Sequence, residues 1–275
     1  GENGSGKSTF IKLLCRLYDP TEGEILLNGI NIKKYNYKEY MSVFSIVFQD
    51  FKLFALPLGQ NVAASTEYDA DKVQECLKLA GFDVHSDRMK KGLDTWLYKD
   101  CDADGVNISG GEEQKIALAR ALYQNAAFLI LDEPTAGMDA LSRRQMWNLL
   151  RKLNGKNLTI LLTTHYMEEA AEADYVVIID DGKISAEGTP LELKNIYTGD
   201  YITIYGVEEK DIKALNIEYE RIRNGYRLSV PNTKAATELI IRNPQLFNDY
   251  EITKGKMDDV FLAVTGKTLV GGAEK

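Results

Sequence analysis

The chain has 275 residues, 44% of them hydrophobic and 27% charged, which is enough for one sizeable globular domain and a smaller one. The formal net charge of −8 argues against general nucleic-acid binding, because proteins that bind nucleic acids favour basic surfaces. The three cysteines (Cys15, Cys76 and Cys101) are too few and too scattered for a disulfide framework or a zinc site, and no apolar run approaches the roughly 18 residues of a membrane span.

The chain begins with a phosphate-binding loop motif. Residues 1–9 fit the pattern G-x-x-x-x-G-K-[ST], in which glycines let the backbone curl so that successive N–H groups face phosphate oxygens. Lys7 supplies a positive charge for the β- and γ-phosphates, and Ser8 supplies a hydroxyl for Mg²⁺. The predicted nucleotide-binding residues are Gly1, Asn3, Gly4, Ser5, Gly6, Lys7, Ser8 and Thr9. The competing interpretation is a glycine-rich surface turn.

The residues after this loop predict a helix that presents its positive dipole end to the anion. Its apolar run starts at Phe10, and we expect the helix to end over residues 14–18. A phosphate loop normally joins a buried strand to its helix, and no residue precedes Gly1 in this sequence. We therefore expect that a central strand is missing upstream of Gly1 and that its loss lowers the stability.

A mostly apolar strand is predicted over 43–48, and it ends at Gln49. A polar amide at the carboxyl edge of a buried strand lies where open α/β sheets bind ligands, although Gln49 alone would be interpreted as a solvated loop residue. The other elements expected in this half are a strand over 24–29 running into an Asn-Gly turn, helices over 37–41, 60–64 and 71–80, and a loop over 90–106.

A second anion site is predicted at the start of the next helix. Ser109 is followed by Glu112 at the capping-box spacing, and Gly110 and Gly111 lie between them. A hydroxyl, glycine N–H groups and a helix start together favour an anion. Because this site is far from the first loop along the chain, we expect it to serve the nucleotide of a partner. The plainer interpretation is a capped helix and nothing more.

Two adjacent carboxylates, Asp132 and Glu133, end the apolar strand predicted over 128–131. Burying both carboxylates is costly without a cation or hydrogen-bond donors. Mg²⁺ would keep Asp132 ionised, and Glu133 would orient and deprotonate a water molecule. The alternative interpretation is an acidic turn before Pro134.

The next buried strand, predicted over 158–162, leads to His165, again a polar residue at a carboxyl edge. A lone histidine in such a place is usually structural. Four edges of this kind, which carry Lys7, Gln49, the pair Asp132-Glu133 and His165, describe one rim of one sheet.

The pattern changes around residues 197–200. Before this point we expect a helix over 140–153, a strand–turn–strand over 175–185 and a closing helix over 191–196. We expect an α/β domain over 1–198, with a helical subdomain over roughly 55–125, and a small α+β domain over 199–275. The small domain has no catalytic constellation in its sequence, and we interpret it as a regulatory or docking domain.

In combination, these motifs resemble the nucleotide-binding domain of ATP-binding cassette (ABC) transporters. Residues 1–9 resemble the Walker A loop, Gln49 the Q-loop, 109–114 the signature motif, 128–133 the Walker B motif, 136–139 the D-loop and His165 the switch histidine. Their order and spacing agree across residues 1 to about 190. The resemblance implies the P-loop NTPase fold of ABC-type ATPases, with a mostly parallel core sheet and a helical subdomain.

The resemblance also implies an ATPase that powers export as a head-to-tail homo- or heterodimer, with ATP and Mg²⁺ at its interface. Each ATP would lie between the Walker A loop of one chain and Ser109, Gly110, Gly111 and Glu112 of the other. Ser8, Gln49 and Asp132 would serve the metal, Glu133 would be the general base, and His165 would contact the γ-phosphate. A transmembrane subunit or domain would hold the chain at the cytoplasmic face of the membrane, through Phe51, Leu53 and Phe54. Ordinary core packing is an equal alternative for these three residues.

The sequence departs from the family pattern at a few positions. Glu112 and Lys115 stand where the signature more often has Gln and Arg, and the aromatic residue that usually stacks on adenine is absent upstream of Gly1. Residues 48–54 and 104–106 resemble exporters with a fused membrane domain. Residues 137–139, 142–145, 163–170 and 257–262 resemble drug-resistance-type export ATPases and large lipid exporters.

Two other interpretations stay open. A soluble ABC-type ATPase of DNA repair or translation would have no membrane partner, although such proteins usually carry long insertions or paired cassettes. A chain without its first strand would be an inactive fragment that serves as a binding module.

Overall fold

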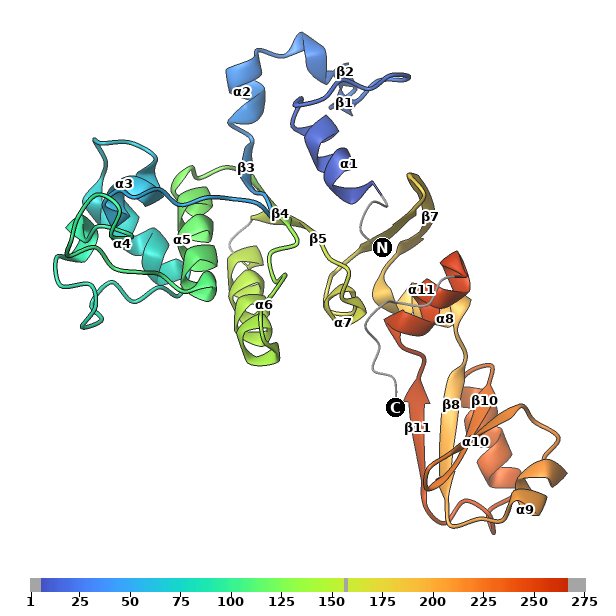
Figure 1. The fold of residues 1–275 in the computed structure, drawn as a ribbon. Helices are drawn as coiled ribbons and strands as arrows, with labels where there is room; N and C mark the ends of the chain where they lie inside the picture. The colour runs from blue at the N-terminus through green and yellow to red at the C-terminus, as the bar shows by residue number, and fades with distance from the viewer. Residues whose placement is uncertain (1–5, 156–157, 267–275) are drawn as a thin grey trace. The chain divides into compact units, whose positions relative to one another are not determined.

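The computed structural model describes residues 6–155 and 158–266, which form two compact units (Figure 1). The first unit runs from Lys7 to Thr164. The second unit is built from the described residues from His165 onwards, together with Gly6.

A three-stranded parallel sheet forms the centre of the first unit, in the order β3-β4-β5. The strands are β3 (Phe44–Val47), β4 (Phe128–Asp132) and β5 (Thr159–Thr163), and Phe128 pairs with both Phe44 and Thr159. All three runs were predicted as buried strands from their apolar residues. Because the strands are parallel, Gln49, Asp132 and Thr163 lie at or beyond carboxyl ends on the same edge of the sheet.

Helices cover both faces of this sheet (Figure 1). Alternate side chains of a strand point to opposite faces, and β4 follows this rule. Ile130 packs with Ile11 of α1 (Lys7–Leu14), whereas Leu129 and Leu131 join a core that includes α5 (Gly110–Tyr123) and α6 (Ala140–Asn154). The strand is therefore buried on both sides, as in other α/β sheets.

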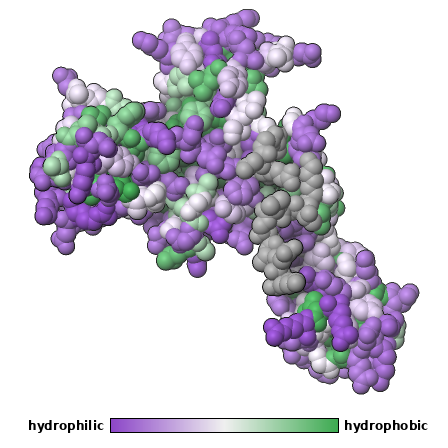
Figure 2. All heavy atoms as spheres, in the orientation of Figure 1, coloured by the Kyte–Doolittle hydropathy of each residue, from purple (hydrophilic) through white to green (hydrophobic). Residues whose placement is uncertain are grey.

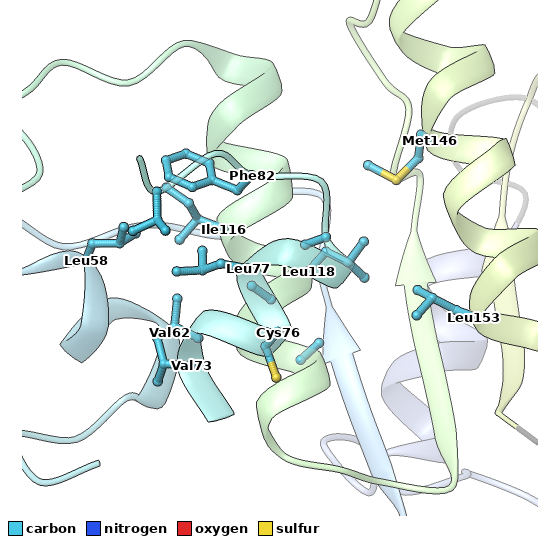
Figure 3. Packing of buried hydrophobic residues seen from close by; sticks show 14 of the residues in the cluster. Leu58, Val62, Val73, Cys76, Leu77, Phe82, Ile116, Leu118, Met146 and Leu153 are labelled. Atoms are coloured by element: carbon cyan, nitrogen blue, oxygen red, sulfur yellow. The ribbon is translucent and has the colours of Figure 1, made fainter. Parts of the chain in front are cut away.

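A helical region packs beside the sheet in the same unit. It contains α3 (Leu58–Ala63) and α4 (Ala70–Leu79), which both pack with α5, and the 3₁₀ turn η2 (Gly92–Asp94), which packs with α3. Figure 3 shows Val62, Leu77 and Ile116, one from each of the three α-helices, gathered in one apolar cluster, and all three side chains are fully buried. This cluster fixes α5, whose first residues carry the predicted second anion site.

The segment after α1 agrees with its prediction. The helix ends at Leu14, within the predicted range of 14–18, and Arg16 then adopts a left-handed backbone with φ 54°. The predicted Asn-Gly turn is present, with φ values of 51° and 76° at Asn28 and Gly29, and it joins β1 (Leu26–Leu27) to β2 (Ile30–Asn31). The 3₁₀ turn η1 (Ile32–Lys34) and α2 (Tyr37–Met41) follow.

The second unit opens with a small apolar core of its own. Its elements are α7 (Met167–Ala170), β6 (Val176–Asp180), β7 (Lys183–Gly188), α8 (Pro190–Tyr197) and the last helix, α11 (Met257–Thr265). Val260 and Phe261 of α11 pack against Ile178 and Leu193. The last helix thus packs on elements that precede residue 199, the predicted domain boundary.

Residues 200–254 form a βαββαβ module with an antiparallel sheet in the order β11-β8-β10-β9. Its elements are β8 (Asp200–Tyr205), α9 (Glu209–Ala214), β9 (Tyr219–Ile222), β10 (Gly225–Val230), α10 (Thr233–Arg242) and β11 (Tyr250–Lys254). This order of elements is the ferredoxin-like arrangement. Figure 2 shows hydrophilic side chains over much of the face of the molecule that it draws. Within residues 6–155 and 158–266, no helix has the length and apolar character needed to cross a bilayer.

Candidate functional site

The predicted phosphate loop is described only at its end. Gly1, Asn3, Gly4 and Ser5 lie outside the described residues. Gly6 has a φ of 101°, a backbone conformation that favours glycine, and Lys7, Ser8 and Thr9 form the first turn of α1. The hydroxyl groups and the lysine of the motif are thus at the positive end of a helix dipole.

Lys7 and Glu133 lie together although they are distant in sequence. The Lys7 ammonium is 3.7 Å from Glu133 Oε1, and the side chains are 13% and 8% exposed. Opposite charges attract more strongly in such a partly dry place than in water. The lysine predicted to bind phosphate and the carboxylate predicted to be the base therefore face the same small volume.

Asp132 is held by a residue of the neighbouring strand. Thr163 Oγ1 donates a hydrogen bond of 2.6 Å to Asp132 Oδ1 and accepts one of 3.0 Å from the backbone N–H of Glu133. Asp132 is only 4% exposed, so an oriented donor lowers the cost of burying its charge. Sequence analysis predicted His165 as the polar residue at this end of the strand and did not predict a role for Thr163.

Glu133 has an unusual backbone. Its φ is 49°, in the left-handed region that non-glycine residues rarely occupy, at a cost of about 1–3 kcal/mol. The carbonyl of Glu133 accepts a hydrogen bond of 3.1 Å from the N–H of Ala136, which holds the turn after β4. Strained residues of this kind concentrate at active sites, where the surrounding structure fixes them.

A pocket brings Gln49 to the same carboxylates. Gln49, Asp132 and Glu133 line it together with Gln114 of α5 and apolar side chains from β3 and α6. Gln114 Nε2 donates to the Ala136 carbonyl at 3.4 Å, and its Oε1 is buried with no hydrogen-bond partner among the described residues. The structure thus unites four sequence-predicted residues, Lys7, Gln49, Asp132 and Glu133, in the first unit.

The predicted second anion site has the capping box that its sequence indicated. Glu112 Oε2 accepts hydrogen bonds from the N–H and the hydroxyl of Ser109, at 2.9 and 2.7 Å, and the Glu112 N–H reaches Ser109 Oγ at 3.4 Å. A Cβ atom added to Gly110 or Gly111 would meet nothing within 4 Å, and neither residue has a positive φ. Neither packing nor conformation within this unit therefore requires glycine here.

The loop that follows Gln49 is tied to α5 by Arg120. The Arg120 Nε donates to the Asn61 carbonyl at 2.8 Å, and Nη1 donates to the Lys52 carbonyl at 3.1 Å. The Asn61 side chain is 1% exposed and bonds both the N–H and the carbonyl of Phe54 at 2.9 Å. These hydrogen bonds therefore join the helix that carries the second anion site to the loop after Gln49.

His165 is the first residue of the second unit. Its ring centroid is 4.1 Å from that of Tyr166, in a tilted arrangement. His165 belongs to a different unit from Lys7, Gln49, Asp132 and Glu133. Its contact with a γ-phosphate stays a prediction.

Comparison with known proteins identifies the family. The family model described as "ABC transporter" matches residues 1–136, which include the phosphate loop, Gln49, the second anion site and the carboxylate pair. Residues 1–136 therefore carry an ABC transporter domain. The predicted resemblance and the ABC-type ATPase fold are thereby confirmed.

Similar proteins are named as a flippase, a transport ATP-binding protein and an ABC exporter. The chain is 36% identical over 195 residues to an ATP-dependent lipid A-core flippase of Vibrio vulnificus, covering 70% of this chain and 33% of that protein. It is 37% identical over 196 residues to a subtilin transport ATP-binding protein of Bacillus subtilis, with 70% and 32% covered. A solved bacterial Atm1-family ABC exporter with ATP bound has 30% identity and a TM-score of 0.62, with 70% and 33% covered. The chain thus spans about a third of the length of these ABC proteins.

Proposed function

We propose that this chain binds and hydrolyses ATP as the ATPase part of an exporter. The observation that carries the proposal is the convergence of the phosphate-loop lysine and the Walker B carboxylates: Lys7 lies 3.7 Å from Glu133, and Asp132 and Glu133 share a pocket with Gln49. The names of the relatives, a flippase and a transport ATP-binding protein, support export over a soluble ATPase of DNA repair or translation.

Each predicted site residue of the first unit has a role in this proposal. Lys7 neutralises the β- and γ-phosphate oxygens, and the start of α1 faces them. Glu133 orients the attacking water and accepts its proton, and its backbone is fixed by Thr163. Gln49, which lines the same pocket as Glu133, helps to place the water.

The residues fit Mg²⁺, which prefers carboxylate and hydroxyl oxygens together with phosphate oxygens. Asp132 offers a buried carboxylate already oriented by a hydroxyl donor, and Ser8 offers a hydroxyl in the first turn of α1. When bound, Mg²⁺ supplies charge neutralisation of the triphosphate. Thr163 orients Asp132 for this task.

A second ATPase domain, of the same or a related chain, completes the nucleotide-binding site in a head-to-tail dimer. The start of α5 presents Ser109, Gly110 and Gly111 to the ATP held by the other domain. Glycine at both positions leaves the N–H groups open to close approach, and a Cβ atom there would meet nothing within this chain. An approaching ligand therefore explains two glycines that the fold does not require.

The membrane partner is a transmembrane subunit or domain, and the loop after Gln49 contacts it at the cytoplasmic face. Of the three predicted contact residues, Leu53 packs against the core of the helical region and Phe51 lines the pocket with Gln49. Phe54 is 58% exposed, with the Arg120 guanidinium 5.8 Å from its ring centroid. Phe54 is therefore the contact residue of this loop, held by Arg120 and Asn61.

The direct test is Mg²⁺-dependent ATP turnover by the purified protein, together with its mass in solution with and without ATP. The proposal predicts turnover that needs Mg²⁺ and a dimer that forms with ATP. A protein that binds no ATP, or that hydrolyses ATP with no tendency to dimerise, contradicts the proposal. Loss of turnover on removal of the Phe54 ring would be unexpected, because that ring contacts the membrane partner and not the nucleotide.

A further inference from the structure

We propose that Arg88 is a positioning residue for the second anion site: it neutralises the Glu112 carboxylate and so lets the start of α5 accept the phosphates of an ATP held by another ATPase domain. The inference rests on the proposed function. It assigns a task to a residue that belongs to none of the family motifs described above.

Arg88 contacts both the first turn of α5 and the residues that precede it. Its Nη1 lies 3.1 Å from Glu112 Oε1 and 3.3 Å from Oε2, so one nitrogen bridges both carboxylate oxygens. Its Nη2 donates to the backbone carbonyl of Asn107. These contacts hold the guanidinium between Asn107, which precedes the helix, and Glu112, the third residue of the helix.

The contact between Arg88 and Glu112 reduces electrostatic repulsion of phosphate at this site. Helix starts attract anions, and here the attraction must serve a highly charged triphosphate. A carboxylate in the first turn competes for that attraction and repels the incoming phosphates. A neighbouring cation removes the repulsion while leaving the glycine N–H groups exposed.

The Glu112 carboxylate is held in its charged form. Burial raises its pKa, but hydrogen bonds from the N–H and hydroxyl of Ser109 and the charge of Arg88 outweigh burial, so the pKa lies below its ordinary value. At neutral pH the negative charge is therefore present whenever ATP arrives. The capping box also keeps this carboxylate beside Ser109, where the phosphates are expected.

The exposure of Arg88 indicates that its ion pair with Glu112 contributes little to the stability of the fold. Arg88 is 51% exposed, and a surface ion pair of this kind contributes little to folding. Lys91 offers a matched control three residues away. It is 53% exposed, and its ammonium lies 3.9 and 3.6 Å from carboxylate oxygens of Asp102 and Asp104 rather than beside Glu112.

The test is a double-mutant cycle read by ATP-driven dimerisation. Arg88→Gln, Glu112→Gln and the double variant are each placed in a Glu133→Gln background, which prevents turnover during the measurement. The mass in solution gives the ATP concentration for half-maximal dimer. We expect Arg88→Gln to raise that concentration by about tenfold when Glu112 is present, and by less than about twofold when Glu112 is already Gln.

Two further variants separate charge from structure. Arg88→Lys keeps the charge and restores at least part of the loss, whereas Lys91→Gln leaves dimerisation unchanged. Melting temperatures of all variants, measured without nucleotide, stay within a few degrees of one another.

The outcomes are distinct. An Arg88→Gln effect of the same size in both backgrounds means that Arg88 acts only by holding the Asn107 carbonyl, and this overturns the inference. Dimerisation by Arg88→Gln equal to that of the parent overturns it as well, while the proposed function stands. A parent protein that binds ATP but never dimerises overturns the proposed function and this inference together.

Discussion

The Thr163 hydroxyl donates a hydrogen bond to Asp132 Oδ1 at 2.6 Å and accepts one from the Glu133 N–H at 3.0 Å. One side chain of β5 thus orients the carboxylate proposed to serve Mg²⁺ and the peptide unit of the proposed base. The bond crosses from the last residue of β5 to the last residue of β4, which pair in parallel register. A polar residue at this strand end is therefore part of the site and not a solvated cap.

Replacing Thr163 by Val removes both hydrogen bonds while keeping the shape of the side chain. We expect Mg²⁺-dependent ATP turnover to fall about 10–100-fold, because residues that orient metal ligands have effects of this size. The free energy of unfolding falls by about 1–3 kcal/mol, since a buried N–H and a buried carboxylate lose a partner. Thr163→Ser keeps the hydroxyl and serves as the control. Turnover by Thr163→Val equal to that of Thr163→Ser would count against the role of the hydroxyl.

Lys7→Ala tests the cationic part of the site. Loss of charged hydrogen bonds to phosphate weakens ATP binding by about 10–100-fold. Binding is measured by titration with a fluorescent ATP analogue. Lys12→Ala is the matched control, because Lys12 lies on the same helix with its ammonium over the Tyr18 ring. Equal affinities for the two variants would show that Lys7 does not contact the nucleotide.

Gly110→Ala separates ligand approach from folding. Nothing lies within 4 Å of the added Cβ, so the free energy of unfolding changes by no more than about 1 kcal/mol, in the stabilising direction for a helical residue. ATP-driven dimerisation, in contrast, weakens by about tenfold or more because the methyl group blocks the approach of phosphate. Gly105→Ala gives the opposite pattern, since its Cβ would lie 1.8 Å from the Tyr98 carbonyl oxygen and must disturb the fold. A normal dimer from Gly110→Ala contradicts the proposed interface.

Arg120→Met tests the link between α5 and the loop after Gln49. The substitution leaves the carbonyls of Asn61 and Lys52 without their charged donor, and we expect a loss of about 2–4 kcal/mol in the free energy of unfolding. Denaturant unfolding gives the value. Arg120→Lys keeps the charge without the planar fork and recovers only part of it. A loss below about 1 kcal/mol would mean that the loop does not depend on the hydrogen bonds of Arg120.

Local signals in the sequence predicted many of the elements well. The bounds of α2 agree to the residue with the helix predicted over 37–41, because Asn36 caps this helix with its side chain. Ser109 and Glu112 likewise form the predicted capping box. Such contacts join residues three or fewer positions apart, so their spacing alone indicates them.

The contacts that complete the site are long-range and leave no such pattern. Thr163 bonds a residue 31 positions away, and Arg120 bonds one 59 positions away. The positive φ of Glu133 also has no signature, since glutamate rarely adopts it. A spacing pattern therefore predicts which strand ends meet. Only the folded structure shows which side chains orient the site residues at those ends.

The most direct test of the account is ATP turnover by Glu133→Gln beside ATP binding by the same variant. The amide keeps the size of the side chain but cannot accept a proton, so kcat falls by about 10²–10⁴-fold. Affinity for ATP persists, because the phosphate contacts of Lys7 and α1 are unchanged. Turnover near that of the parent protein, or loss of binding in step with loss of turnover, would contradict the role of Glu133 as the base.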